Sequence, residues 1–175
     1  MTGVKQNMKN SLGCINTNVL VITDMTRPNL KDANNAEKYI KGIAEQISHF
    51  DGEVYFIVND LITDFQNQLV PELSIYANES NRYVGNGAAS LAMDLGVSKF
   101  DVINGNFDGT FTNISKVEIV GVYTETSVLT SAVMLKSFLP DAKIVVNANL
   151  CIGKTPNLHA DALRVLSANA ICVKI

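Results

Sequence analysis

The chain has 175 residues, 47% of them hydrophobic, and a formal net charge of −3. This length fits one domain of ordinary size with enough apolar material for a substantial core. The negative charge and the lack of any run of Lys and Arg argue against a nucleic-acid partner, and every apolar stretch falls well short of the roughly 20 residues that span a bilayer.

The chain begins with a polar segment and then a buried strand. Residues 1–17 lack the apolar core of a signal peptide and are predicted to be a loose extension, or an arm that docks on a neighbour, ahead of a single domain over residues 18–175. Residues 19–23 are apolar and β-branched, as in a parallel strand that is buried on both faces. Asp24 follows at once, so this strand ends in a carboxylate.

A helix and a second strand are predicted next. Asn34 and Glu37 occupy the positions of a capping box, and the apolar residues after them recur at helical spacing until an Asp-Gly turn. Residues 54–58 then form the second strand. Residues 60–84 are polar and irregular, which in a compact domain indicates a functional loop.

Helices and strands continue to alternate in the second half of the chain. Apolar strands that alternate with helices indicate a parallel sheet covered on both faces. We therefore predict an α/β fold, a three-layer sandwich with a central six-stranded parallel sheet. The remaining predicted elements are helices over 86–95, 125–138 and Thr155-Pro156 to about Ser167, and strands over 100–104, 117–122, 143–147 and 170–174.

Sites in such sheets lie beyond the carboxyl ends of the strands. Ser127 is predicted in the first turn of the helix after strand 117–122, where unpaired amides and the helix dipole favour negative charge. A nucleophile there would have an oxyanion hole of backbone N–H groups, although capping by Thr124 or Thr126 explains the same pattern. The other strand-end segments are Asp24, Asn59-Asp60, Asn104-Gly105 and Asn147 to Cys151.

Several short motifs occur in a fixed order along residues 18–174, and together they resemble the isochorismatase-like cysteine hydrolases, which include nicotinamidases. The Gly-Val-x-Thr element is the most specific of them. The motifs are Asp24 in VLVITDMTRPNL, Phe107-Asp108-Gly109-Thr110, Gly121-Val122-Tyr123-Thr124 followed by Val128, and then Cys151, His159 and Ala162-Leu163.

The resemblance implies catalytic roles for Asp24 and Ser127, with the backbone N–H groups of Tyr123 and Ser127 as the oxyanion hole. We expect Asn104, Tyr123 and Asp60 to contribute to substrate binding. The resemblance also implies a cis peptide bond before Tyr123 and assembly into dimers or larger rings.

The departures from the family pattern matter as much as the matches. Ser127 stands where the family has its nucleophilic Cys, and a hydroxyl is a weaker acid than a thiol and needs a strong base. Residues 101–107 contain no Lys, which the family places shortly before Phe-x-Gly-Thr. Residues 59–64 contain carboxylates but no His, so neither a metal site nor a cofactor is predicted.

The three cysteines are far apart and odd in number, which predicts no disulfide framework and no zinc site. A reduced, cytoplasmic protein is the simplest interpretation. Cys151 matches a position that the family often fills with a non-catalytic Cys, and Cys172 is expected in the core. Cys14 falls in the extension.

Three functional interpretations remain open. The chain is a hydrolase of C–N bonds in small amides that uses Asp24 as base and Ser127 as a weak nucleophile, an engineered Cys-to-Ser variant of such an enzyme, or a catalytically silent protein that binds a small molecule or serves as a subunit of a homo-oligomer. The absence of the Lys as well as the Cys favours the silent interpretation, because losing one member of a cooperating set already removes most of the rate.

Overall fold

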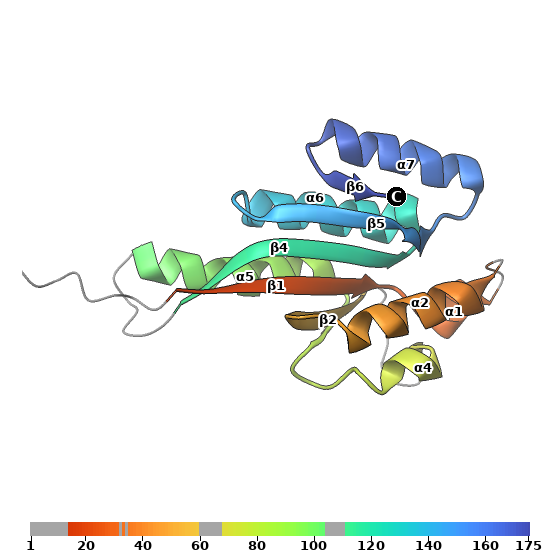
Figure 1. Ribbon diagram of the computed structural model, residues 1–175, viewed down its shortest axis with the longest axis horizontal. Coiled ribbons are helices and arrows are strands. Elements are labelled where there is room, and N and C mark those ends of the chain that lie inside the picture. The colour runs from red at the N-terminus through yellow and green to blue at the C-terminus, as the bar shows by residue number, and fades with distance from the viewer. Residues whose placement is uncertain (1–13, 32, 34, 60–67, 104–110) are drawn as a thin grey trace, which may run out of the picture.

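The sheet of this computed structural model has six parallel strands, in the order β3-β2-β1-β4-β5-β6 (Figure 1). The structure describes residues 14–31, 33, 35–59, 68–103 and 111–175. The strands are β1 (Cys14–Thr23), β2 (Glu53–Val58), β3 (Arg82–Val84), β4 (Phe111–Val122), β5 (Lys143–Ile152) and β6 (Cys172–Lys174). The helices are α1 (Arg27–Leu30), α2 (Ala36–Ser48), α4 (Pro71–Ser74), α5 (Gly87–Ile103), the π-helical turn η1 (Thr124–Val128), α6 (Leu129–Phe138) and α7 (Pro156–Ala168).

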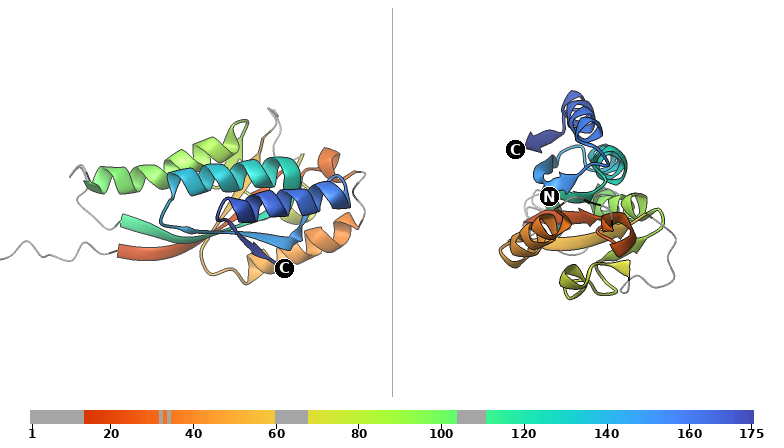
Figure 2. Two further views of the ribbon diagram at one scale, coloured as in Figure 1. Left: turned by 90° about the horizontal axis from the view of Figure 1, so that it is seen from above. Right: turned by 90° about the vertical axis from the view of Figure 1, so that its right-hand side faces the viewer.

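The central strand β1 is apolar on both faces because each face packs into a separate core. Val19 and Val21 belong to the core under α5, α6 and α7, whereas Leu20 and Ile22 belong to the core under α2 and α4 (Figure 2). This arrangement confirms the predicted three-layer α/β architecture. No helix in the described part of the chain is long and apolar enough to cross a membrane.

The prediction of a strand over residues 100–104 is wrong, because residues 87–103 form the single helix α5. The sixth strand of the sheet is instead β3, which pairs with β2 through Phe56↔Arg82 and Val58↔Val84. It lies, with α4, inside the segment 60–84 that is predicted from the sequence to be a loop. The error over residues 100–104 arises because a short apolar run fits a helix and a strand equally well. No proline separates these residues from the helix before them.

Several element boundaries also differ from the predicted ones. β1 begins at Cys14, so residues 14–17, predicted as part of the extension, pair with β4 from Phe111 to Ile114. The N-cap of α2 is Asn35 and not the predicted Asn34, and Asn35 makes no side-chain capping hydrogen bond. Residues 1–13 lie outside the described residues. The predicted start of α7 is confirmed: Thr155 caps it by accepting from the backbone N–H of Leu158, and a proline follows.

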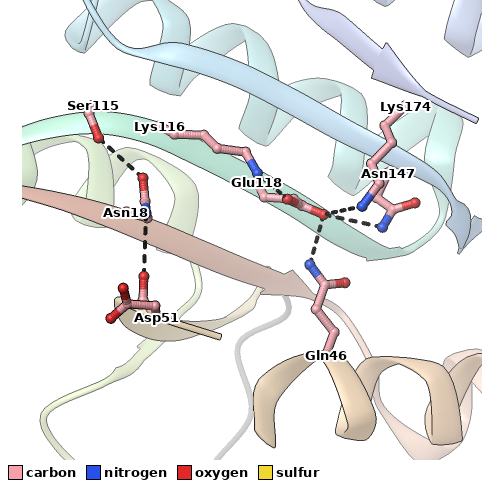
Figure 3. A network of polar contacts seen from close by, with 8 residues as sticks. All are labelled: Asn18, Gln46, Asp51, Ser115, Lys116, Glu118, Asn147 and Lys174. Carbon is pink, nitrogen blue, oxygen red and sulfur yellow. Dashed lines mark hydrogen bonds and ion pairs between the residues drawn. The ribbon is translucent and has the colours of Figure 1, made fainter. Parts of the chain in front are cut away.

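A polar network crosses the α2 side of the sheet around Glu118, which is only 3% exposed (Figure 3). Its carboxylate oxygens lie 2.5 Å from Lys116 Nζ and 3.6 Å from Lys174 Nζ. They also accept hydrogen bonds from Gln46 Nε2 at 2.8 Å and Asn147 Nδ2 at 3.2 Å. Burial raises the pKa of Glu118, but Lys116, Gln46 and Lys174 outweigh burial and hold the pKa below its usual value. The network ties α2 and β6 to the middle of the sheet.

Candidate functional site

Asp24 and Ser127 meet at the carboxyl end of the sheet. Asp24 directly follows β1, has a backbone φ of 50°, and donates its N–H to Ile57 O at 2.8 Å. Ser127 lies in η1, directly after β4, and its hydroxyl donates to Asp24 Oδ2. The two residues named as a catalytic pair from the sequence are therefore in direct contact, although 103 positions separate them.

The Asp24 carboxylate is nearly buried, at 5% exposure, and is held mainly by Asn59. The backbone N–H of Asn59 donates to Oδ1 at 2.7 Å, and its side-chain amide donates to Oδ2 at 3.0 Å. With Ser127, this gives three neutral donors to one carboxylate. Among the residues that the structure describes, no Lys, Arg or His forms an ion pair with Asp24.

The turn that carries Ser127 begins at Tyr123. The Val122–Tyr123 peptide bond is cis, as the resemblance implied. The carbonyl of Tyr123 accepts from the N–H groups of Thr126 at 3.1 Å and Val128 at 3.2 Å, and its phenol donates to Asn29 O at 2.6 Å. Tyr123 is thus the residue from which η1 starts, and no side chain caps the turn there.

Thr124 and Glu125 tie η1 to α7 and to the segment just before it. The hydroxyl of Thr124 forms a hydrogen bond with His159 Nδ1 at 2.8 Å, and Glu125 Oε1 accepts from the backbone N–H of Lys154 at 3.0 Å. The ammonium group of Lys154 lies 5.2 Å from the centre of the Tyr123 ring, a cation–π contact. Burial lowers the pKa of His159, and the Glu125 carboxylate opposes that shift.

The structure describes only part of the predicted site. Asn104 and Asp60, predicted to bind substrate, lie outside the described residues. Asn59 is a partner of Asp24 that sequence reasoning missed as a site residue, although its place at the end of β2 was a signal. His159, one of the motif residues, lies on α7 and reaches across to η1. Sequence periodicity gives no sign of that contact, because the two residues belong to different elements.

The segment from Asn59 to Asp64 does not fit a zinc or iron site, because its sequence offers carboxylates without imidazole or thiolate. Within the described ranges, no group of three or more His, Cys, Asp and Glu side chains could hold a metal ion. The donor groups on these residues therefore give no basis for assigning a metal to the Asp24–Ser127 site.

Cys151 is expected to resist alkylation in the folded protein. It is buried, its thiol lies 3.9 Å from Ile119 O, and burial raises its pKa to about 12. The prediction that Cys172 lies in the core is wrong, because Cys172 is exposed on the edge strand β6. Because the thiolate is the reactive form, iodoacetamide at pH 8 should label Cys172 and leave Cys151 unmodified, as read by peptide mass spectrometry. Denatured protein, in which both react, is the control. Equal labelling of both in native protein would contradict the buried position.

Comparison with known proteins shows which solved structures have a similar fold. No family model and no curated protein sequence matches the chain. An isochorismatase-like hydrolase from Alkaliphilus metalliredigens matches with a TM-score of 0.62 and 16% identity, over 94% of this chain and 93% of that one. The nicotinamidase PncA from Bacillus subtilis matches with a TM-score of 0.60 and 14% identity, over 91% and 99%.

The YcaC gene product from Escherichia coli, described as an octameric hydrolase of unknown specificity, gives a TM-score of 0.67 at 16% identity, over 90% of this chain and 74% of that one. Identities this low support a statement about fold and not about activity. The chain has the isochorismatase-like hydrolase fold.

Proposed function

We propose that this chain binds a small molecule at the Asp24–Ser127 site and hydrolyses amides very slowly or not at all. The observation that carries the proposal is the set of hydrogen bonds to the Asp24 carboxylate. Its carboxylate is engaged by the Ser127 hydroxyl and by two N–H groups of Asn59, with no cationic partner in the described part of the chain.

Hydrolysis at this site would require Asp24 to act as a strong base. The carboxylate would have to take the proton of the Ser127 hydroxyl as the oxygen attacks, and a hydroxyl gives up its proton far less readily than a thiol. As the proton moves to Asp24, the single negative charge passes to the oxygen of the tetrahedral intermediate. A nearby cation normally stabilises such developing charge, and none of the described Lys, Arg or His side chains forms an ion pair with Asp24.

Binding requires only polar contacts from the same groups and no proton transfer. The Ser127 hydroxyl and the Asp24 carboxylate offer polar contacts to a ligand amide, and the backbone N–H groups of Tyr123 and Ser127 are proposed to face its carbonyl oxygen. Asp60, which follows β2, is proposed to complete the site. The strand end that was the reason for including Asn104 is absent, because residues 87–103 form the helix α5. The Lys154 ammonium over the Tyr123 ring adds positive charge nearby, which suits a ligand with a carboxyl or carbonyl group.

Assembly with further copies of the chain, in the cytoplasm, is part of the proposal. One solved structure with the same fold is described as an octamer. Light scattering should therefore give a mass larger than the 19.0 kDa of a single chain. A monomer at micromolar concentration would contradict this part.

One contact favours a second function, an active hydrolase of C–N bonds in small amides. The Ser127 hydroxyl donates to Asp24 Oδ2, which is the nucleophile–base contact that such a reaction requires. In that case Ser127 would attack the amide carbonyl and Asp24 would pass the hydroxyl proton to the leaving amine. Water would then release the acid from the serine ester.

Ammonia release from nicotinamide and benzamide separates the two functions. We expect no turnover above background by the chain as it is. Robust turnover that is lost in Asp24→Asn would overturn the silent interpretation and support the hydrolase. Turnover that appears only in Ser127→Cys would indicate that the site remains competent and that the serine replaces an active cysteine.

Thermal-shift measurements with nicotinamide and nicotinate test binding. A ligand at 100 times its Kd stabilises the folded state by about 2.7 kcal/mol, which for a domain of this size raises Tm by roughly 5–11 °C. Asp24→Asn should reduce that rise. Ser137→Ala is the matched control for surface changes, because Ser137 is exposed on α6 and its hydroxyl donates to Val133 O of the same helix. No rise with any small aromatic amide or acid would count against a binding role.

A further inference from the structure

The turn η1 contacts α7 through a partly buried hydrogen bond. Thr124 is fully buried, and its hydroxyl lies 2.8 Å from Nδ1 of the half-buried His159. Burying a hydroxyl and an imidazole is unfavourable unless each finds a partner, and here each satisfies the other. The bond therefore fixes how η1 sits against α7.

A second contact, made by Glu125, also holds this turn, but it uses only one of the two carboxylate oxygens. Glu125 Oε1 accepts from the backbone N–H of Lys154, but Glu125 Oε2 is buried and has no hydrogen-bond partner among the described residues. The two segments approach closely at Gly153, where a Cβ atom would lie 2.7 Å from His159 Cβ and 3.0 Å from Glu125 Oε2. His159, Glu125 and Gly153 are thus packed together beside a carboxylate oxygen that lacks a donor.

From this geometry we propose that His159 is a positioning residue for the Ser127 turn, and that its protonation switches the turn between two arrangements. In the neutral state, Nδ1 accepts the Thr124 hydroxyl. When solvent protonates the ring, both ring nitrogens become donors, so the Thr124 hydroxyl must turn round to accept. The imidazolium then attracts the unpartnered Glu125 Oε2.

Movement of Thr124 or Glu125 is expected to reach the Asp24–Ser127 pair because all three turn residues belong to η1. The turn is five residues long, directly follows Tyr123, and carries the hydroxyl that donates to Asp24. Small displacements of a reacting or binding group change binding and rate strongly. The consequence for ligand binding rests on the proposed binding function.

Glu125 is the charged group that acts most directly on the imidazole. Burial lowers the pKa of His159 and Glu125 opposes that effect, so the ring titrates below its ordinary value of 6.5. The other charged groups on neighbouring elements are engaged elsewhere. Lys154 Nζ lies over Tyr123, Lys136 of α6 donates to Pro140 O, Lys174 of β6 pairs with Glu118, and Asp161 pairs with Arg164 on α7 itself.

An NMR titration of the full chain between pH 5 and 8 tests the proposal without a ligand. The ring protons of His159 and the backbone N–H groups of Thr126 and Val128 should titrate together, with one midpoint below 6.5. His49→Asn is the control, because His49 is exposed at the end of α2 and its removal should leave this titration unchanged.

Two substitutions separate positioning from packing. His159→Asn places an amide where Nδ1 was, so it should keep the chemical shifts of the turn seen at neutral pH and abolish their pH dependence. His159→Leu removes the hydrogen bond and should move those shifts at every pH. The proposal is overturned if the turn does not titrate with His159, or if the Asn and Leu variants change the turn equally.

A thermal-shift comparison with nicotinate at pH 5 and pH 7.5 separates this inference from the proposed function. A stabilisation at pH 7.5 that is at least halved at pH 5 in the unsubstituted chain, but not in His159→Asn, supports both. Absence of binding at both pH values, together with a turn that titrates with His159, would count against the binding function and leave the positioning role supported.

Discussion

Replacing Gly121 with Ala is expected to lower the free energy of unfolding by about 3 kcal/mol or more. Gly121 has a φ of +128°, and a Cβ atom there would lie 2.1 Å from the carbonyl oxygen of Thr23 and 2.8 Å from its nitrogen. Both are backbone atoms of β1, so neither can move aside without breaking the pairing of β1 with β4. At roughly 2–4 °C per kcal/mol, Tm should fall by about 6–12 °C in thermal unfolding followed by circular dichroism.

Gly96→Ala is the matched control for this prediction. Gly96 lies inside α5, and the nearest atom to an added Cβ is 3.7 Å away, an ordinary contact. Because Ala is favoured over Gly in a helix by roughly 0.5–1 kcal/mol, this variant should be slightly more stable than the original chain. An unchanged Tm for Gly121→Ala would show that β1 and β4 do not approach as closely as described.

Glu118→Gln should destabilise the protein by about 1.5–3 kcal/mol at neutral pH, the range for hydrogen bonds to a charged group. The change keeps the size of the side chain but removes the charge that Lys116 and Lys174 face. It also places an amide against the donors Gln46 Nε2 and Asn147 Nδ2. Urea unfolding gives the difference, and Glu45→Gln, at an exposed position on α2, should change stability by less than about 0.5 kcal/mol.

The effect of Glu118→Gln should also depend on pH. The folded-state pKa of Glu118 lies below the value in the unfolded chain. The stability from its charge is therefore fully present above the unfolded pKa of about 4.3, and it is lost as pH falls through the folded-state pKa. The gap in stability between the original chain and the variant should narrow below about pH 4. A gap of constant size down to about pH 3 would show that the lysines do not stabilise the carboxylate.

The sequence predicted those parts of the fold that depend on strong local patterns. β1 and β4 contribute apolar residues to a core on each face because helices cover both faces, and the start of α7 follows from a threonine cap and a proline. β3 is only three residues long, and the apolar end of α5 satisfies the patterns of both element types. Neither could be assigned without knowing which segments are neighbours in space.

The contacts of the candidate site could likewise be predicted only in part. Asp24 and Ser127 stand at strand ends that the topology brings together, so their contact could be anticipated. The contacts of Asn59 with Asp24 and of Thr124 with His159 each join side chains 35 residues apart. Such contacts depend on how two elements pack, which no local pattern records.

The two edges of the sheet limit how the protein can associate with its own copies. β3 and β6, the outermost strands, are three residues long each. A neighbouring chain that added a strand against β3 or β6 would pair with three residues only, which limits edge-to-edge growth at those two strands. An assembly with a defined number of subunits is therefore expected to use side-chain surfaces of the helices and loops, where geometry and composition can select the partner.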